Sequence, residues 1–190
     1  MPLPLRHRAA LVAVALLASA GARSATASAD DGTPSDASRA RTIAVEGCRG
    51  ARVYLNADEK ATLELHNTHR RMSGLPTFCV DARLTAAARA HSDDMLARSY
   101  FSHTSFDGMG FGARVTGFGY GPVRILAENI AWGSGSLGGA EHTFENWLNS
   151  AGHRANIQNA LLREIGIGVS TGTFQRLSGA RVYTVDFGTH

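Results

Sequence analysis

The chain has 190 residues, of which 44% are hydrophobic and 18% are charged, and its formal net charge is +3. Two arginines would leave with the apolar N-terminal segment described next, which holds no acid, so the remaining chain would carry +1. A nearly neutral chain without a Lys/Arg cluster argues against nucleic acid as a partner and against charge-driven binding to a membrane surface.

The segment Met1–Ala20 has the layout of a signal peptide. A basic start is followed by an apolar run, Ala9–Ala20, which is shorter than the about 20 residues that a membrane span needs. Small-x-small sites at Ala18–Ala20 and Ala27–Ala29 predict cleavage after residue 20 or after residue 29. We therefore expect a secreted or periplasmic protein with no transmembrane segment in the mature chain.

A disordered leader and one folded domain are predicted to follow. Gly21–Arg41 is rich in Ala, Ser, Thr and Asp and has hardly a large apolar side chain, so it cannot bury enough surface to fold. The folded domain would run from Thr42 to His190, and we expect it to be a monomer. The two cysteines, Cys48 and Cys79, are expected to form a disulfide, since export places them in an oxidising compartment.

The first half of the domain carries two helical patterns. Asn56–Met72 begins with a capping-box spacing. Its histidines, His66 and His69, are expected to pack or cap, because no acid stands nearby at helical spacing to complete a metal site. A second helix is predicted over Asp81–Arg98, and His91 on its apolar stripe is expected to be partly buried in the core.

Glycine-rich and apolar segments follow the second helix. Phe101–Gly108 is a loop by composition and places aromatic residues around His103, and a short helix is predicted around Ala113–Phe118. Ile125–Trp132 then carries a lone carboxylate, Glu128, among apolar residues. A glutamate there is either paired, because burying it alone is costly, or exposed at a strand edge.

A third helix carries Phe144 and Trp147 on one face and is predicted to stop at Gly152. His153 would follow directly, and Ile157 would anchor the segment again. A histidine fixed in this place either satisfies backbone groups at the helix end or serves as a group that titrates near neutral pH.

The last part of the chain predicts two strands. Ile165–Val169 and Val182–Phe187 are rich in β-branched and aromatic residues, and Thr171–Gly179 between them has hairpin-like turn chemistry. Helices followed by antiparallel strands predict an α+β domain with helices stacked on a sheet.

Three titratable residues stand between apolar or aromatic neighbours: His103, Glu128 and His153. Together they could hold a divalent metal, since imidazole with carboxylate and water suits zinc. They could also run acid–base chemistry, with the carboxylate setting the tautomer and pKa of a histidine. A structural hydrogen bond under a cleft is the third interpretation, and spacing along the chain does not choose among them.

The chain resembles the bacterial branch of the CAP superfamily, also called SCP, which contains the cysteine-rich secretory proteins, insect venom antigen 5 and plant pathogenesis-related proteins. The resemblance runs from about Asn56 to Gly188. Its four ordered motifs are Phe101–Thr104, Ala127–Ile130, Gly152–Ile157 and Glu164–Val169.

The resemblance implies a three-layer α-β-α sandwich of the CAP type with a small antiparallel sheet and a large central cleft. In the family, two histidines and two acids line that cleft, and in some members it binds a divalent ion such as zinc. His103 and His153 match the two histidines, and Glu128 matches one acid. The second acid normally stands three residues after the helix tryptophan, where this chain has Ser150.

The resemblance leaves two functions in view, because family members are linked to sterol or lipid binding, to partner proteins and to proteolysis. We expect a cleft that binds a divalent ion, a small or lipid-like ligand or a partner protein, since one acid is missing and no clear nucleophile is evident. The alternative is an extracellular metal- or serine-dependent hydrolase that uses His103, Glu128 and His153, with Ser150 as a conceivable nucleophile.

Overall fold

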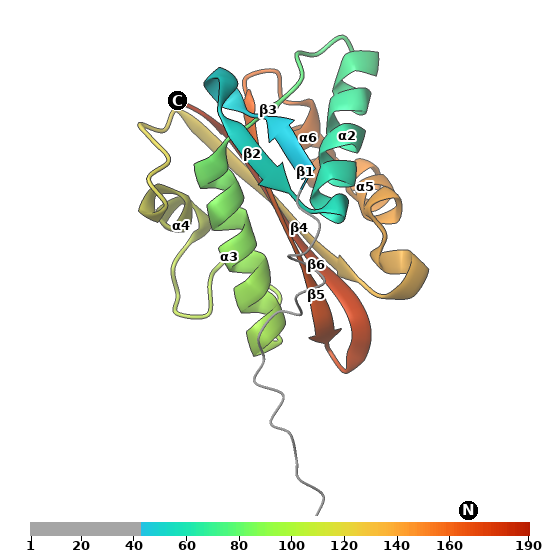
Figure 1. Ribbon diagram of the computed structural model, residues 1–190. Coiled ribbons are helices and arrows are strands. Elements are labelled where there is room, and N and C mark those ends of the chain that lie inside the picture. The colour runs from blue at the N-terminus through green and yellow to red at the C-terminus, as the bar shows by residue number, and fades with distance from the viewer. Residues whose placement is uncertain (1–42) are drawn as a thin grey trace, which may run out of the picture. The chain divides into compact units, whose positions relative to one another are not determined.

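The computed structural model describes residues 43–190, so the predicted signal peptide and leader lie outside the described residues. A four-stranded sheet with the order β3-β5-β6-β4 forms the middle layer, and a two-stranded sheet, β1-β2, lies beside it (Figure 1). Helices α2, α5 and α6 pack on one face and α3, with α4, on the other, which confirms the predicted α-β-α sandwich. The elements are β1 (Ile43–Glu46), η1 (Cys48–Gly50), β2 (Arg52–Leu55), α2 (Ala57–Met72), β3 (Cys79–Val80), α3 (Ala82–Arg98), α4 (Phe111–Gly117), β4 (Ile125–Gly133), η2 (Gly135–Gly138), α5 (Ala140–Asn149), α6 (Ala151–Gln158), β5 (Glu164–Phe174) and β6 (Leu177–Thr189).

The central hairpin β5–β6 is longer than the sequence predicted. Its turn consists of Gln175 and Arg176, with φ angles of 49° and 70°. Two positive φ angles define a type I′ turn, whose twist matches that of the flanking strands. The expected hairpin is present, but its turn is shorter than Thr171–Gly179, because seven of those nine residues lie in β5 or β6.

Helix α3 lies unusually close to β5 because two glycines face it. A Cβ atom built on Gly166 would stand 2.1 Å from the carbonyl carbon of Leu84, and one on Gly168 would stand 2.3 Å from the amide nitrogen of Arg89. Only glycine permits that approach. The helix begins as predicted, since the Asp81 carboxylate accepts a hydrogen bond from the Leu84 N–H at 3.3 Å.

The face covered by α2 holds an aromatic core. His66 is fully buried there, with its ring centroid 4.9 Å from that of Phe144 and 5.8 Å from that of Trp147. Its Nδ1 lies 2.8 Å from the carbonyl oxygen of Thr62, which confirms a packing role. Arg70 is also buried and donates hydrogen bonds to four backbone carbonyls, those of Pro76, Ile157, Asn159 and Leu162.

The break between α5 and α6 lies at Ser150, whose φ and ψ are −98° and 121°. The predicted stop at Gly152 was wrong, because Gly152 lies in the first turn of α6 and His153 is a helical residue. The Ser150 carbonyl accepts a hydrogen bond from the Arg154 N–H at 2.8 Å, so the chain re-enters a helix at once. Ile157 is fully buried and anchors α6 as expected.

The predicted disulfide is present. Cys48 and Cys79 are joined across a sequence separation of 31 residues, so the bond ties η1 to β3 just before α3 begins. The short helix predicted around Ala113–Phe118 is α4, which starts two residues earlier. Within residues 43–190, no helix combines the length and apolar character that crossing a membrane would require.

Candidate functional site

The candidate site is organised by two consecutive residues of β4, Glu128 and Asn129. Successive side chains of a strand point to opposite faces of the sheet. Glu128 therefore reaches the α3 face, where its Oε1 accepts a hydrogen bond from Nδ1 of His103 at 2.7 Å. Asn129 reaches the α6 side, where its Nδ2 donates to the His153 carbonyl at 3.2 Å and its Oδ1 accepts from Asn156 at 2.9 Å. The two residues thus attach both histidine-bearing segments to the same stretch of β4.

Side chains of α5 and α6 also cover the outer edge of β4. Trp147 Nε1 donates to the Ile130 carbonyl at 3.2 Å, and Asn156 Nδ2 donates to the Glu128 carbonyl at 3.4 Å. An uncovered strand edge is prone to pairing with other chains. These bonds occupy that edge and fix where α6, and with it His153, stands.

The Glu128 carboxylate is buried and paired, so the first of the two alternatives for this residue holds, even though β4 is an edge strand. Its second oxygen, Oε2, pairs with the guanidinium of Arg114, which is itself buried. Arg114 also donates to Ser105 Oγ at 2.9 Å and to the His103 carbonyl at 3.3 Å. Each carboxylate oxygen therefore has a partner, which offsets the cost of burying the charge.

His103 presents a defined nitrogen to solvent. A carboxylate can only accept hydrogen bonds when ionised, so the Glu128 contact places a hydrogen on Nδ1 of His103. In the neutral ring, Nε2 then carries the free lone pair. The His103 side chain is 54% exposed, so this lone pair is open to a ligand.

His153, in the first turn of α6, is half-buried. Its pKa is lowered below the usual value, first by burial and second by the charge that His103 carries when protonated. The second cause requires that the two imidazoles lie within electrostatic range of each other. Hydrogen bonds to Glu128 and Asn129 hold the two segments at neighbouring positions of β4. The lowered pKa keeps His153 mainly neutral near pH 7.

The three residues do not present a complete metal-ligand set. Among residues 43–190, one group offers three ligand atoms within 4.8 Å of one another, and it consists of Glu164 with the two disulfide cysteines. His103, Glu128 and His153 do not form such a group, and both Glu128 oxygens already have partners. Ser150 stands at the position of the family's second acid and has no carboxylate, so it does not extend the set. The region therefore supplies two imidazoles, while Glu128 orients one of them.

Two buried residues of this region were missed by the sequence analysis. Arg114 is one of two basic residues between His103 and Glu128 in the sequence. Because burying an unpaired carboxylate is costly, the lone Glu128 indicated that one of these basic residues pairs with it. Asp186 stands directly opposite Glu128 in the β4–β6 register, is fully buried, and has no hydrogen-bonding partner for either oxygen among the described residues. Burial first, and the Glu128 charge second, raise the pKa of Asp186 well above its usual value. An acid inside an apolar strand pattern was the signal that could have found it.

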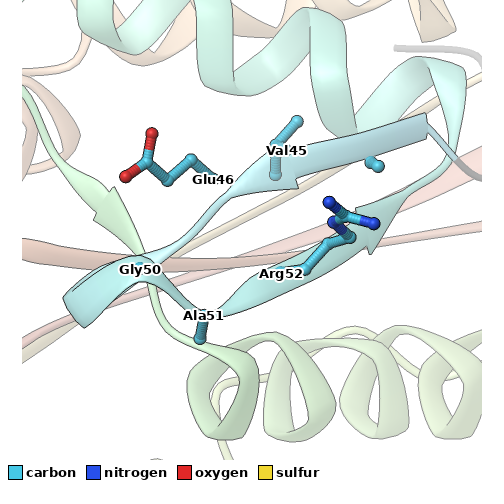
Figure 2. Close-up of a pocket in the computed structure, with 6 residues that line it drawn as sticks. Val45, Glu46, Gly50, Ala51 and Arg52 are labelled. Atoms are coloured by element: carbon cyan, nitrogen blue, oxygen red, sulfur yellow. The ribbon is translucent and has the colours of Figure 1, made fainter.

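Hollows also lie away from β4. One of about 410 Å³ lies along the β1–β2 hairpin and is lined by Ala44, Val45, Glu46, Gly50, Ala51 and Arg52. Figure 2 shows Glu46 and Arg52 among these residues. These two charged residues stand opposite each other in the hairpin register. None of the candidate site residues lines this hollow, so it adds nothing to the chemistry of the histidines.

The fold and the site together define an α-β-α sandwich with two histidines and a buried glutamate at one sheet edge. The sequence model of the cysteine-rich secretory protein family, CAP, matches residues 63–187, which is most of the described chain. The chain therefore belongs to the CAP superfamily, in its bacterial branch.

Similar proteins come from several bacteria. The uncharacterized protein YkwD of Bacillus subtilis is 37% identical over 120 residues, which cover 60% of this chain and 43% of the relative. The chain thus spans less than half the length of that relative. An extracellular protein of Bacillus anthracis that contains an SCP domain is 28% identical with a TM-score of 0.59, over 70% of this chain and 40% of that one. An outer surface protein of Borrelia burgdorferi shares the fold, with 20% identity and a TM-score of 0.60 over 70% of this chain and 92% of its own.

Proposed function

We propose that this protein acts outside the cytoplasm as a CAP domain that binds a ligand at the β4 edge without hydrolysing it. The observation that carries the proposal is the bond from His103 Nδ1 to Glu128, since it leaves Nε2 free and open to solvent. The signal-peptide pattern of Met1–Ala20 supports export. The extracellular and outer-surface relatives from Bacillus anthracis and Borrelia burgdorferi agree with that location.

The two imidazoles define what the site can take. His103 and His153 would hold a divalent ion such as zinc, with Glu128 fixing the His103 ring from behind. Established zinc sites use three or four protein ligands, so two imidazoles give only modest affinity. The same acceptor nitrogens would receive hydrogen bonds from O–H or N–H groups of a small or lipid-like ligand or of a partner protein.

The hydrogen bonds of the site support ligand binding better than hydrolysis. A serine nucleophile needs a base within hydrogen-bonding reach. In the described part of the chain, no serine hydroxyl is hydrogen-bonded to either imidazole: Ser102 Oγ accepts from the Thr104 N–H and Ser105 Oγ from Arg114. Ser150, the conceivable nucleophile, makes no side-chain bond at the start of α6.

Calorimetric titration with zinc chloride at pH 7 tests the proposal. We expect a saturable heat in the wild type, at least a tenfold loss of affinity in His103→Ala and His153→Ala, and a loss of about 10- to 100-fold in Glu128→Gln. His69→Ala, which removes a histidine from α2, is the matched control and should titrate like the wild type.

Two results would contradict the proposal. Equal zinc binding in the wild type and both histidine variants would show that His103 and His153 are not the zinc ligands. Turnover of a peptide, ester or glycan substrate that disappears in His103→Ala and His153→Ala, while circular dichroism shows an intact fold, would replace binding with hydrolysis.

A further inference from the structure

The disulfide lies next to a third side chain that can bind metal. Cys48, Cys79 and Glu164 each place one potential ligand atom within 4.8 Å of the other two, and they are the one group of this kind among residues 43–190. Thiolate sulfur and carboxylate oxygen are both ligands that zinc uses in proteins. The three side chains therefore have the composition of a metal site once the two sulfurs are no longer bonded to each other.

Backbone pairing holds these three residues together in addition to the disulfide. Cys79 stands directly beside Glu164 in the parallel β3–β5 register. Gly47, one residue before Cys48, pairs with Val80 across an isolated bridge. A Cβ atom built on Gly47 would stand 2.6 Å from the Val80 carbonyl oxygen, so only glycine lets this part of the chain approach β3 so closely. We therefore expect the three residues to remain neighbours after the disulfide is reduced.

Glu164 keeps one carboxylate oxygen for a ligand. Its Oε2 accepts a hydrogen bond from the Tyr120 hydroxyl and another from Nδ1 of His190 at 2.8 Å. Its Oε1 makes no hydrogen bond to any described residue. Hydrogen bonds of this kind orient the carboxylates that bind metals in proteins. Tyr120 and His190 thus fix the carboxylate and leave Oε1 for an ion.

A hollow of about 380 Å³ gives reagents access to the sulfurs. Cys48 lies in its wall together with Arg49 and Arg83, and both cysteines are partly exposed. The charge of Arg83 is balanced by Asp81, which leaves Arg49 as a positive charge near the cysteine. Positive charge favours the thiolate, which is the form of cysteine that binds metal. The hollow also admits water, which would complete a four-coordinate site.

We propose that Cys48, Cys79 and Glu164 bind a thiophilic divalent ion such as zinc when the disulfide is reduced. A dithiol reductant attacks the bond through a thiolate, passes through a mixed disulfide and leaves as its own disulfide, so two electrons and two protons end on the two cysteines. The ion then binds both sulfurs as thiolates, and the two protons go to solvent. The site goes beyond the proposed role of the histidines, since it shares no residue with them.

Titration of the full chain with cobalt(II) before and after reduction tests the site, because a cobalt–thiolate bond gives a charge-transfer absorption that imidazole ligands do not give. A water-soluble phosphine supplies the two electrons and is removed under nitrogen before the titration. We expect no such absorption in the oxidised protein. In the reduced protein we expect a saturable absorption at one cobalt per chain, which zinc should displace because it binds more tightly.

Two variants and a control assign the ligands. The double variant Cys48→Ser, Cys79→Ser should show no charge-transfer absorption. Glu164→Gln keeps the shape of the side chain and should raise the cobalt dissociation constant at least about tenfold, a loss typical even of residues that only support a ligand. Glu46→Gln, the matched control, removes an exposed carboxylate two residues before Cys48 and should bind cobalt like the reduced wild type.

Circular dichroism before and after reduction shows whether the fold survives. Loss of the fold on reduction overturns the proposal, because packing must hold the three residues without the bond. A folded, reduced protein without the charge-transfer absorption overturns it as well. Equal cobalt affinity in the wild type and Glu164→Gln would show that the carboxylate is not a ligand, and the proposed site would not exist.

Discussion

The two faces of the central sheet bury ionisable groups in different ways. On the α2 face, His66 is packed among aromatic rings, and Arg70 donates to backbone carbonyls and stacks on the Phe78 ring. On the α3 face, two carboxyl groups, those of Glu128 and Asp186, stand opposite each other, and Arg114 forms an ion pair with Glu128. His66 and Arg70 on the α2 face thus have aromatic and backbone partners, whereas the α3 face places a buried ion pair next to the candidate site.

The same difference makes the two faces respond to pH in opposite directions. Burial lowers the pKa of His66 to about 4, so His66 favours the folded state above pH 6.5 and loses that contribution as pH falls. Burial raises the pKa of Asp186, so this group favours the folded state at acid pH and loses that contribution as pH rises. Desolvation is the first cause in both cases, and the sign follows from which form is charged.

The largest effect is expected from Arg70→Met on the α2 face. The substitution leaves four carbonyls without their donor, and we expect the free energy of unfolding to fall by about 4 kcal/mol or more. Urea denaturation measures this change. Arg71→Met, at the neighbouring exposed position, should stay within about 0.5 kcal/mol of the wild type. A similar loss in both variants would show that Arg70 does not hold the α2 face together.

The next effect is a pH dependence that belongs to His66. Its pKa is 6.5 in an unfolded chain and about 4 in the folded one, so acidification from pH 7 to pH 4 should cost about 3 kcal/mol of stability through this group. In His66→Phe that part of the dependence should vanish, which urea denaturation at several pH values can measure. If the variant lost stability as steeply as the wild type over this range, His66 would not be the group responsible.

The smallest effect is expected from Asp186→Asn on the α3 face. An amide cannot ionise and can donate to the neighbouring Glu128 carboxylate, so we expect a gain of about 1 kcal/mol at pH 8. The gain should shrink toward pH 4, where Asp186 is protonated in the folded chain and partly protonated in the unfolded one. Thermal unfolding at the two pH values measures it. A gain that is larger at pH 4 than at pH 8 would mean that the ionised form of Asp186 is the one stabilised by folding.

Much of the framework could be predicted because its signals are local. The capping residues Asn56 and Asp81 mark the starts of two helices, and alternating β-branched residues mark β5 and β6. The Cys48–Cys79 bond followed from the cysteine count and the expected compartment. The predicted position of the helix break was wrong for a local reason as well. Gly152 adopts helical backbone angles, and Ser150 adopts the extended ones.

What the sequence determined by itself is therefore the helices α2, α3, α4 and α5, the strands β5 and β6, the disulfide and the three residues His103, Glu128 and His153 as a candidate group. Only the tertiary structure decided that Glu128 is buried against Arg114, that its other carboxylate oxygen accepts from His103, and that Asp186 stands opposite it. The formation of a helix or a strand depends mainly on the conformational preferences of residues that are close together in the chain. Burial and pairing depend on residues brought together by packing, because desolvation and charge act through space and not along the sequence.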